Sequence, residues 1–182
     1  MLIFSHEVAR VLPATPQALF DVMSDLRRHP EIAGSEEVKA LRVHGDRPIG
    51  IGTTFEADEE VPFGKKTTRF TAKSIITAYD PPRHIAWRSE PPGRPRATRV
   101  EWSWSFEPTQ GGTRTVHRAE VEFAPLTALT LKPIYGRMRA PYVRRGMERS
   151  LDRLAAAVAG PAVPKPRADA PADRPTPADT GG

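Results

Sequence analysis

The sequence predicts an α+β fold in which a seven-stranded, curved antiparallel sheet wraps around one long C-terminal helix. Apolar and polar residues alternate through successive segments up to residue 123, and turns rich in proline and glycine separate them. This pattern is typical of an antiparallel sheet with one buried face. From Leu126 onward the apolar residues recur about every 3.6 positions, which indicates a helix, and Gly160 supplies its stop signal.

Two short helices are expected between the first strand and the second. Thr15 is placed to cap the first helix, because its hydroxyl accepts a backbone N–H, and Pro16 suits the first helical position, where no N–H is needed. Apolar residues at helical spacing follow. Asp25 caps a second short turn, which Pro30 is expected to end or kink.

Seven segments alternate well enough to be strands. The segment from Val100 to Phe106 is the cleanest, since Trp102 and Trp104 point the same way as both of its ends. Thr and Ile are frequent in the fourth segment, as expected for a strand. We expect strands at residues 4–12, 36–45, 53–61, 66–79, 84–90, 99–107 and 113–123.

Composition divides the 182 residues into one domain and a tail. Residues 1–159 carry the whole net charge of +5 and are long enough for a proper core. Residues 160–182 contain six prolines and almost no large side chain, so they are expected to be a disordered tail. Mean hydropathy of −0.47 and the absence of cysteine favour a soluble, cytoplasmic protein without disulfides or thiolate metal sites.

Three stretches resemble one known family. They are residues 12–41, with Thr15, Pro16 and Asp25, the turn at 77–87 and the hairpin at 104–115. Together with the order of the elements they resemble the polyketide cyclase/dehydrase and lipid-transport superfamily (START-like, SRPBCC). The resemblance implies the helix-grip fold, built around an apolar cavity that handles a hydrophobic small molecule.

Large apolar side chains on the inward face are the candidates for the cavity wall. Aromatic rings at the gap between a curved sheet and its helix commonly line a pocket. The alternative is that these rings fill a closed core. The predicted ligand-binding residues are Phe55, Phe70, Ile76, Trp87, Trp102, Trp104, Phe106, Val121, Met138, Tyr142 and Met147.

Polar groups at inward positions are candidates for chemistry, because burial demands partners. Strand alternation places His117 and Glu59 on the apolar face, and Tyr142 lies on the helix. His117 and Glu59 would form an acid/base pair if the sheet brings them together, with Tyr142 as a further donor. The alternative for His117 is a core histidine that a neighbour satisfies.

No motif for a cofactor or a metal is visible. The five histidines lack the spacing of metal ligands, and the sequence contains no glycine-rich phosphate loop that leads into a helix. We therefore expect neither a metal nor a nucleotide cofactor.

The predicted long helix carries many basic residues. They suit an acidic protein partner or an anionic membrane surface, whereas the alternative is a solvated face with ion pairs. Nucleic acid is not expected, because no recognition module is present. The basic residues are Lys132, Arg137, Arg139, Arg144, Arg145, Arg149 and Arg153.

Three functions stay open at this point. The first is binding or transport of a lipid, isoprenoid or polyketide-like molecule. The second is an aromatic polyketide cyclase/dehydratase that moves protons with cavity residues. The third is an interaction or regulatory domain whose cavity is filled by its own side chains.

Overall fold

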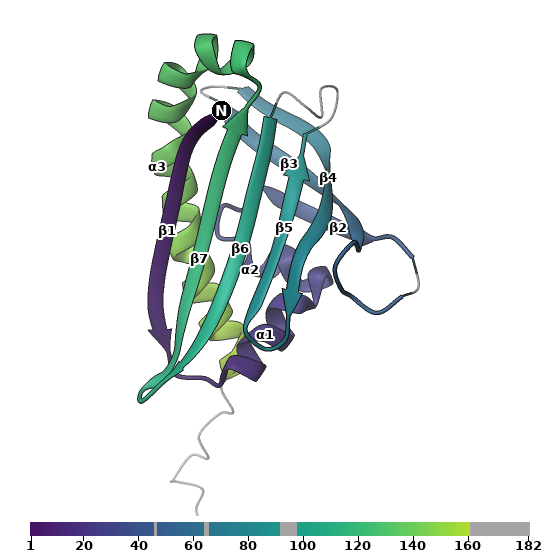
Figure 1. Ribbon diagram of the computed structural model, residues 1–182, viewed down its shortest axis with the longest axis vertical. Helices are drawn as coiled ribbons and strands as arrows, with labels where there is room; N and C mark the ends of the chain where they lie inside the picture. The colour runs from purple at the N-terminus through teal and green to yellow at the C-terminus, as the bar shows by residue number, and fades with distance from the viewer. Residues whose placement is uncertain (46, 64–65, 92–97, 161–182) are drawn as a thin grey trace, which may run out of the picture.

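The structure is a computed structural model that describes residues 1–45, 47–63, 66–91 and 98–160. All the strands form one antiparallel sheet in the order β1-β7-β6-β5-β4-β3-β2, and α3 runs along its open side (Figure 1). The elements are β1 (Leu2–Leu12), α1 (Pro16–Ser24), the 3₁₀ turn η1 (Leu26–Arg28), α2 (His29–Ile32), β2 (Val38–Val43), β3 (Thr54–Phe63), β4 (Lys66–Asp80), β5 (His84–Glu90), β6 (Thr98–Thr109), β7 (Gly112–Phe123) and α3 (Pro125–Ala159).

This architecture confirms the predicted fold class and element order, and each strand end lies within two residues of its predicted place. Thr15 caps α1 as expected, since its hydroxyl accepts a hydrogen bond from Ala18 N at 3.2 Å. Asp25 caps η1 in the same way. The expectation for Pro30 was wrong, because it lies in the first turn of α2, where its missing N–H costs nothing. The predicted disordered tail lies outside the described residues, apart from Gly160.

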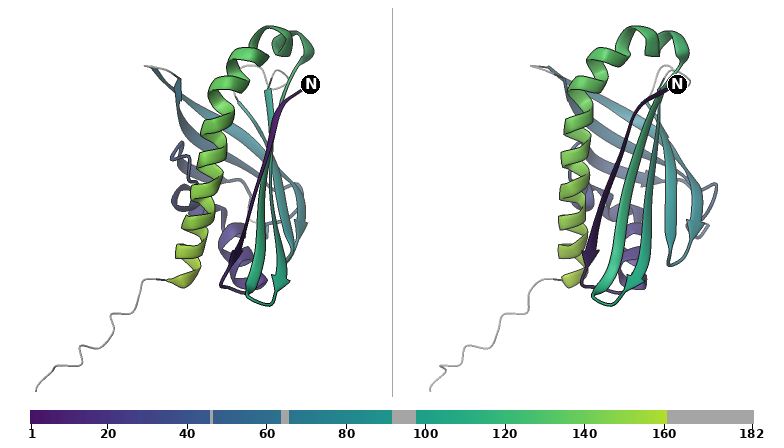
Figure 2. Two further views of the ribbon diagram at one scale, coloured as in Figure 1. Left: turned by 90° about the vertical axis from the view of Figure 1, so that its left-hand side faces the viewer. Right: turned by 60° about the vertical axis from the view of Figure 1, so that its left-hand side comes forward.

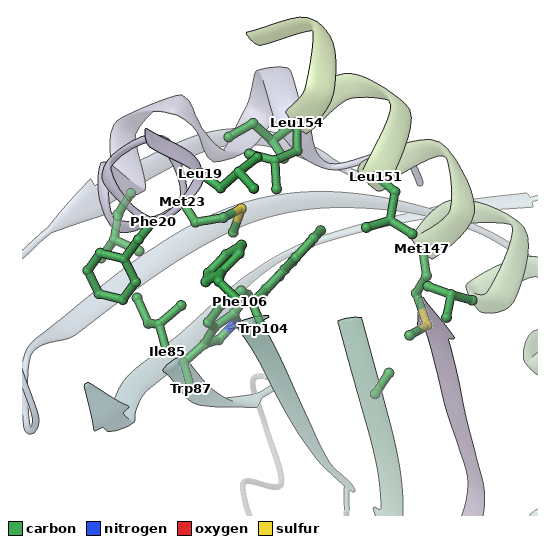
Figure 3. Close-up of a cluster of buried hydrophobic side chains, with 14 of the residues drawn as sticks. Leu19, Phe20, Met23, Ile85, Trp87, Trp104, Phe106, Met147, Leu151 and Leu154 are labelled. Carbon is green, nitrogen blue, oxygen red and sulfur yellow. The ribbon is translucent and has the colours of Figure 1, made fainter. Parts of the chain in front are cut away.

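The hydrophobic core fills one end of the space between the sheet and the helices. Figure 3 shows Leu19 and Phe20 of α1 meeting Trp104 and Phe106 of β6, with Leu151 of α3 closing the side. These side chains are almost completely buried. The short helices therefore plug this end of the curved sheet, and the space toward the other end is left to the cavity described below.

Helix α3 stands against the open side of the sheet, and its first turns bend over the end where β1 begins (Figure 2). Pro133 and Pro141 lie inside this helix and interrupt its ladder of backbone hydrogen bonds. In the described part of the chain, no helix is both long enough and apolar enough to cross a membrane.

The turn after α2 packs unusually close to α3, because two glycines meet there. A Cβ on Gly34 would lie 2.3 Å from Gly146 O, and a Cβ on Gly146 would lie 3.2 Å from Ser35. The Gly34 N–H donates to Ser150 Oγ at 2.8 Å. This close approach fixes the chain between α2 and β2 against the helix, just before it reaches Glu37.

Candidate functional site

A cavity of about 400 Å³ lies between the concave face of the sheet and α3. Its wall is mostly apolar, and its size is that of pockets that hold small organic molecules. All three tryptophans of the sequence lie in this wall. The predicted residues that line the cavity are Phe55, Phe70, Trp87, Trp102, Trp104, Val121 and Met147.

Four residues predicted to bind ligand lie elsewhere. Ile76 and Phe106 are buried in the core at the end that α1 closes, so they face other side chains instead of the cavity. Met138 is 48% exposed on the outer side of α3. Tyr142 turns away from the cavity, and its hydroxyl donates to Ser35 O at 2.9 Å.

The two errors on α3 have one cause. The face of the helix toward the cavity carries Tyr135, Arg139 and Val143, one position beyond Met138 and Tyr142. A charged residue at a buried position hides the helical period, because arginine is counted as outward by the hydrophobic pattern. The hydrophobic pattern therefore selected Met138 and Tyr142 at the two places where the inward residues are Arg139 and Val143.

His117 lines the cavity as the alternation of β7 predicts, and it is 4% exposed. Its Nδ1 lies 3.1 Å from Ser103 O, and since a carbonyl oxygen only accepts, Nδ1 carries the hydrogen. The ring stacks on Trp104 with centroids 3.9 Å apart. Burial lowers the pKa of His117 to about 4, so the imidazole is neutral at physiological pH and its Nε2 is an acceptor.

His29 is a second cavity histidine, which the sequence analysis did not propose. Its Nε2 donates to Met23 O at 3.2 Å, and its ring packs against Trp87 at 5.0 Å. Burial also lowers the pKa of His29 to about 4, which leaves Nδ1 as an acceptor. Its place in a helix of four residues gives no periodic signal, so pattern reasoning had no way to orient it.

A buried ion pair crosses the cavity wall between α3 and the start of β2. Both Arg139 Nη atoms donate to the Glu37 carboxylate, at 2.8 and 3.0 Å, and each side chain is about one-tenth exposed. Burial works to lower the pKa of Arg139, but the hydrogen bonds and the charge of Glu37, together with Tyr135, outweigh burial and raise that pKa. The guanidinium also lies over the Tyr142 ring, 4.9 Å from its centroid. The prediction that Arg139 belongs to a basic outer face of α3 is wrong, because Arg139 is buried and pairs with Glu37.

Glu59 of β3 lines the cavity beside this pair, as the alternation predicts. Within the described residues no hydrogen bond or ion pair reaches its carboxylate. Burial, and then the negative charge of Glu37, raise the pKa of Glu59 to about 7, while Arg139 works against them. The group therefore holds a proton for about half of the time near neutral pH, which suits proton transfer.

The structure does not join His117 and Glu59 into one acid/base pair. Strands β6, β5 and β4 separate β7 from β3 in the sheet. His117 has His29 as its titratable neighbour, whereas Glu59 has Glu37 and Arg139. The cavity thus has two polar regions, one with the imidazoles and one with the carboxylates. Among the described residues no cluster of His, Asp or Glu could hold a metal ion.

The other basic residues of α3 are partly paired. Arg144 pairs with Glu148 at 3.2 Å, and Arg153 hydrogen-bonds to Ala33 O at 2.9 Å and pairs with Glu36. A groove between β1 and α3 is lined by Arg144, Arg145 and Glu148, among other residues. Acids and bases alternate in this groove, so it presents no field of a single sign.

The sequence matches a known family, and the fold has counterparts among solved structures. The family model described as polyketide cyclase/dehydrase and lipid transport matches residues 4–159, whereas no curated protein matches the chain. The di-domain aromatase/cyclase StfQ of the steffimycin biosynthetic pathway is similar over 87% of this chain and 51% of its own, with 17% identity and a TM-score of 0.67. This chain therefore spans about half the length of StfQ.

Two further solved structures are similar in fold. The Zhui aromatase/cyclase from Streptomyces sp. R1128 has 14% identity and a TM-score of 0.62, over 86% of this chain and 93% of its own. Norcoclaurine synthase from Thalictrum flavum has 16% identity and a TM-score of 0.57, over 86% of this chain and 92% of its own. At such identities these likenesses show the fold alone, whereas the family model covers nearly all of the described residues. The chain belongs to the polyketide cyclase/dehydrase and lipid transport family.

Proposed function

We propose that the chain binds or carries a hydrophobic small molecule, such as a lipid, an isoprenoid or a polyketide-like compound, in its internal cavity. The observation that supports this most directly is the cavity of about 400 Å³ walled by Trp87, Trp102 and Trp104. An apolar ligand that fills it gains about 25 cal/mol for each Å² of apolar surface removed from water, before the costs of binding. The proposal keeps a cytoplasmic location, which the absence of cysteine supports.

Native mass spectrometry of the purified protein, followed by denaturing extraction, tests this function. We expect a co-purifying apolar molecule, or uptake of one from a panel, at one molecule per chain. Ala72→Phe is the matched control, because Ala72 is 3% exposed and lines the cavity, so a ring there occupies the ligand's space. Equal uptake by this folded variant would contradict binding in the cavity.

A second candidate function is a cyclase or dehydratase activity, which Glu59 favours. A carboxyl group with a pKa of about 7 in an apolar cavity can remove a proton from a carbon next to a carbonyl and later return it. The imidazoles of His117 and His29 are weaker candidates as bases, since the pKa of each lies at about 4.

Deuterium exchange into a bound cyclic ketone, followed by NMR in heavy water, tests this second candidate. The carboxylate of Glu59 would take the proton beside the carbonyl, and the enolate would take back a deuteron. We expect exchange above the buffer rate that is lost in Glu59→Gln. It should persist in Glu60→Gln, whose carboxylate faces Arg69 outside at 2.7 Å. Equal rates in both variants would dismiss Glu59 as the base.

A further inference from the structure

We propose that the cavity selects neutral ligands that donate hydrogen bonds through hydroxyl or amide groups, and that it excludes ligands carrying a carboxylate. This inference rests on the proposed function, because it names the chemical class of the molecule held in the same cavity. It follows from which polar atoms of the wall are already engaged and which are not.

The two imidazoles present acceptors to the cavity. Each ring has one nitrogen bound as a donor to a backbone carbonyl, Ser103 O for His117 and Met23 O for His29. A neutral imidazole carries a single N–H, so the remaining nitrogen of each ring is an acceptor. Neither backbone bond can be replaced cheaply, since a buried carbonyl without a donor costs about 1–3 kcal/mol. A ligand that contacts the two imidazoles therefore needs an O–H or an N–H group of its own to bond with them.

The region of the cavity around Glu59 and Glu37 also favours a ligand group that donates a hydrogen bond. Glu59 lines the cavity with a carboxylate that no described residue binds, and Glu37 lies beside it. Arg139 is the one arginine or lysine in the described wall, and both of its Nη atoms are bound to Glu37. The buried Nε–H of Arg139 has no partner among the described residues, so one N–H is left for a ligand, on a cation whose charge Glu37 already neutralises. The Ser74 and Ser89 hydroxyls, 2.8 Å apart, are bonded to each other between these regions.

A carboxylate brought into this cavity would meet acceptors at both regions. It would leave its hydration shell and gain at most the single free N–H of Arg139, whose charge Glu37 already neutralises. It would also face the charges of Glu37 and Glu59 at short range. A hydroxyl or a carboxamide of the same size loses less hydration and gains bonds to atoms that have no partner. Discrimination of this kind is large, because a site built to bond a donor leaves its acceptors unpaired when the donor is missing.

Isothermal titration calorimetry with a series of biphenyls tests the inference. Each compound carries the same group at both para positions, which is hydroxyl, methoxy, carboxamide or carboxylate. Near pH 8, where Glu59 is ionised, we expect the hydroxyl and carboxamide compounds to bind at least about tenfold more tightly than the carboxylate, a difference of about 1.4 kcal/mol. The methoxy compound, which is apolar but has no donor, should bind more weakly than the hydroxyl compound.

Two variants test whether the preference for the carboxamide over the carboxylate arises inside the cavity. Glu59→Gln should narrow the gap between the carboxylate and the carboxamide several-fold, whereas Glu60→Gln, which removes the same charge from the outer face of β3, should leave it unchanged. If the carboxylate binds as tightly as the carboxamide in the unaltered protein, the inference is overturned while the proposed function stands. If none of the four compounds binds, the proposed function itself falls.

Discussion

The ionisable side chains of the cavity illustrate one physical effect with two signs. Burial disfavours the charged form of any group, so it lowers the pKa of His117 and raises that of Glu59. Both shifts leave the cavity with fewer charges near neutral pH than its composition indicates. Glu37 and Arg139 form an ion pair in the same wall, in which two hydrogen bonds join the opposite charges.

Glu59 makes the stability of the protein depend on pH. Its folded pKa of about 7 lies above the unfolded value of 4.5, so its contribution to the free energy of unfolding is fully present below about pH 4.5 and is lost as the pH rises through 7. We predict that Glu59→Gln raises the free energy of unfolding near pH 8 by roughly 1–2 kcal/mol relative to the unaltered protein. The difference should largely disappear near pH 5, where both side chains are neutral.

Urea unfolding at the two pH values, with Glu60→Gln as the control, measures this effect. The Glu60 carboxylate is exposed, and its hydrogen bond to Arg69 lowers its pKa, so its removal should not stabilise the protein at either pH. A Glu59→Gln variant that is less stable than the parent near pH 8 would show that the carboxylate has a stabilising partner.

At the residue scale, sequence alternation predicted which side chains of the strands face inward. His117 and Glu59 were found in this way, because a period of two leaves only two faces to choose from. Glu37 was not proposed as a site residue, although the predicted strand at 36–45 included it; the structure begins β2 one residue later, at Val38. Which polar atoms pair is also invisible in a pattern, since pairing depends on distances between residues far apart in the chain, such as Glu37 and Arg139.

Among the elements, α3 matters most for the site, because it closes the open side of the sheet and supplies Arg139 to the wall. The ion pair with Glu37 ties this helix to the start of β2. The close approach of Gly34 and Gly146 is a second contact between α3 and the segment that precedes β2, and it lies further along the helix than the ion pair. Together these two contacts fix α3 against the chain segment that leads into β2, at the edge of the sheet.

Breaking the buried pair should be costly. We predict that Arg139→Met lowers the free energy of unfolding by about 3 kcal/mol, because it leaves Glu37 charged in a buried site. The double variant with Glu37→Met should regain most of this loss, since no charge is then left without a partner. Chemical denaturation measures both values.

Arg144→Met is the matched control for that change. Arg144 also lies on α3 and pairs with a glutamate, but its side chain is 60% exposed, so its loss should cost less than about 1 kcal/mol. An Arg139→Met variant as stable as Arg144→Met would mean that the buried pair contributes nothing to holding the helix in place.

At this scale the sequence predicted the strands better than the long helix. The strands alternate cleanly over many residues, and turns with proline and glycine mark their ends. The length of α3 was also predicted, but its inward face was wrong in the middle of the helix, where Arg139 and not Met138 faces the cavity. Hydrophobic periodicity assigns charged residues to the outside, and a buried ion pair is the case in which that assumption fails.

For the whole molecule, the cavity follows from how a curved sheet meets a single helix. The short helices close one end with Phe20 and Leu19, and the side chains toward the other end do not fill the remaining space. A sequence cannot predict such a volume, because it is a small difference between the space that the backbone encloses and the space that the side chains occupy. The resemblance of the sequence to its family indicated a cavity, whereas the residues alone left open a core filled by the same rings.

The measurement that tests a ligand-filled cavity most directly is NMR of the three tryptophan indole N–H groups during titration with para,para′-biphenol. All the tryptophans of the sequence line the cavity, so their indole signals report on its wall. We predict that the signals of Trp87, Trp102 and Trp104 shift together and saturate at one ligand per chain, and that they stay in place in Ala72→Phe. Binding that leaves all three indole signals unmoved would place the ligand outside the cavity and contradict the account.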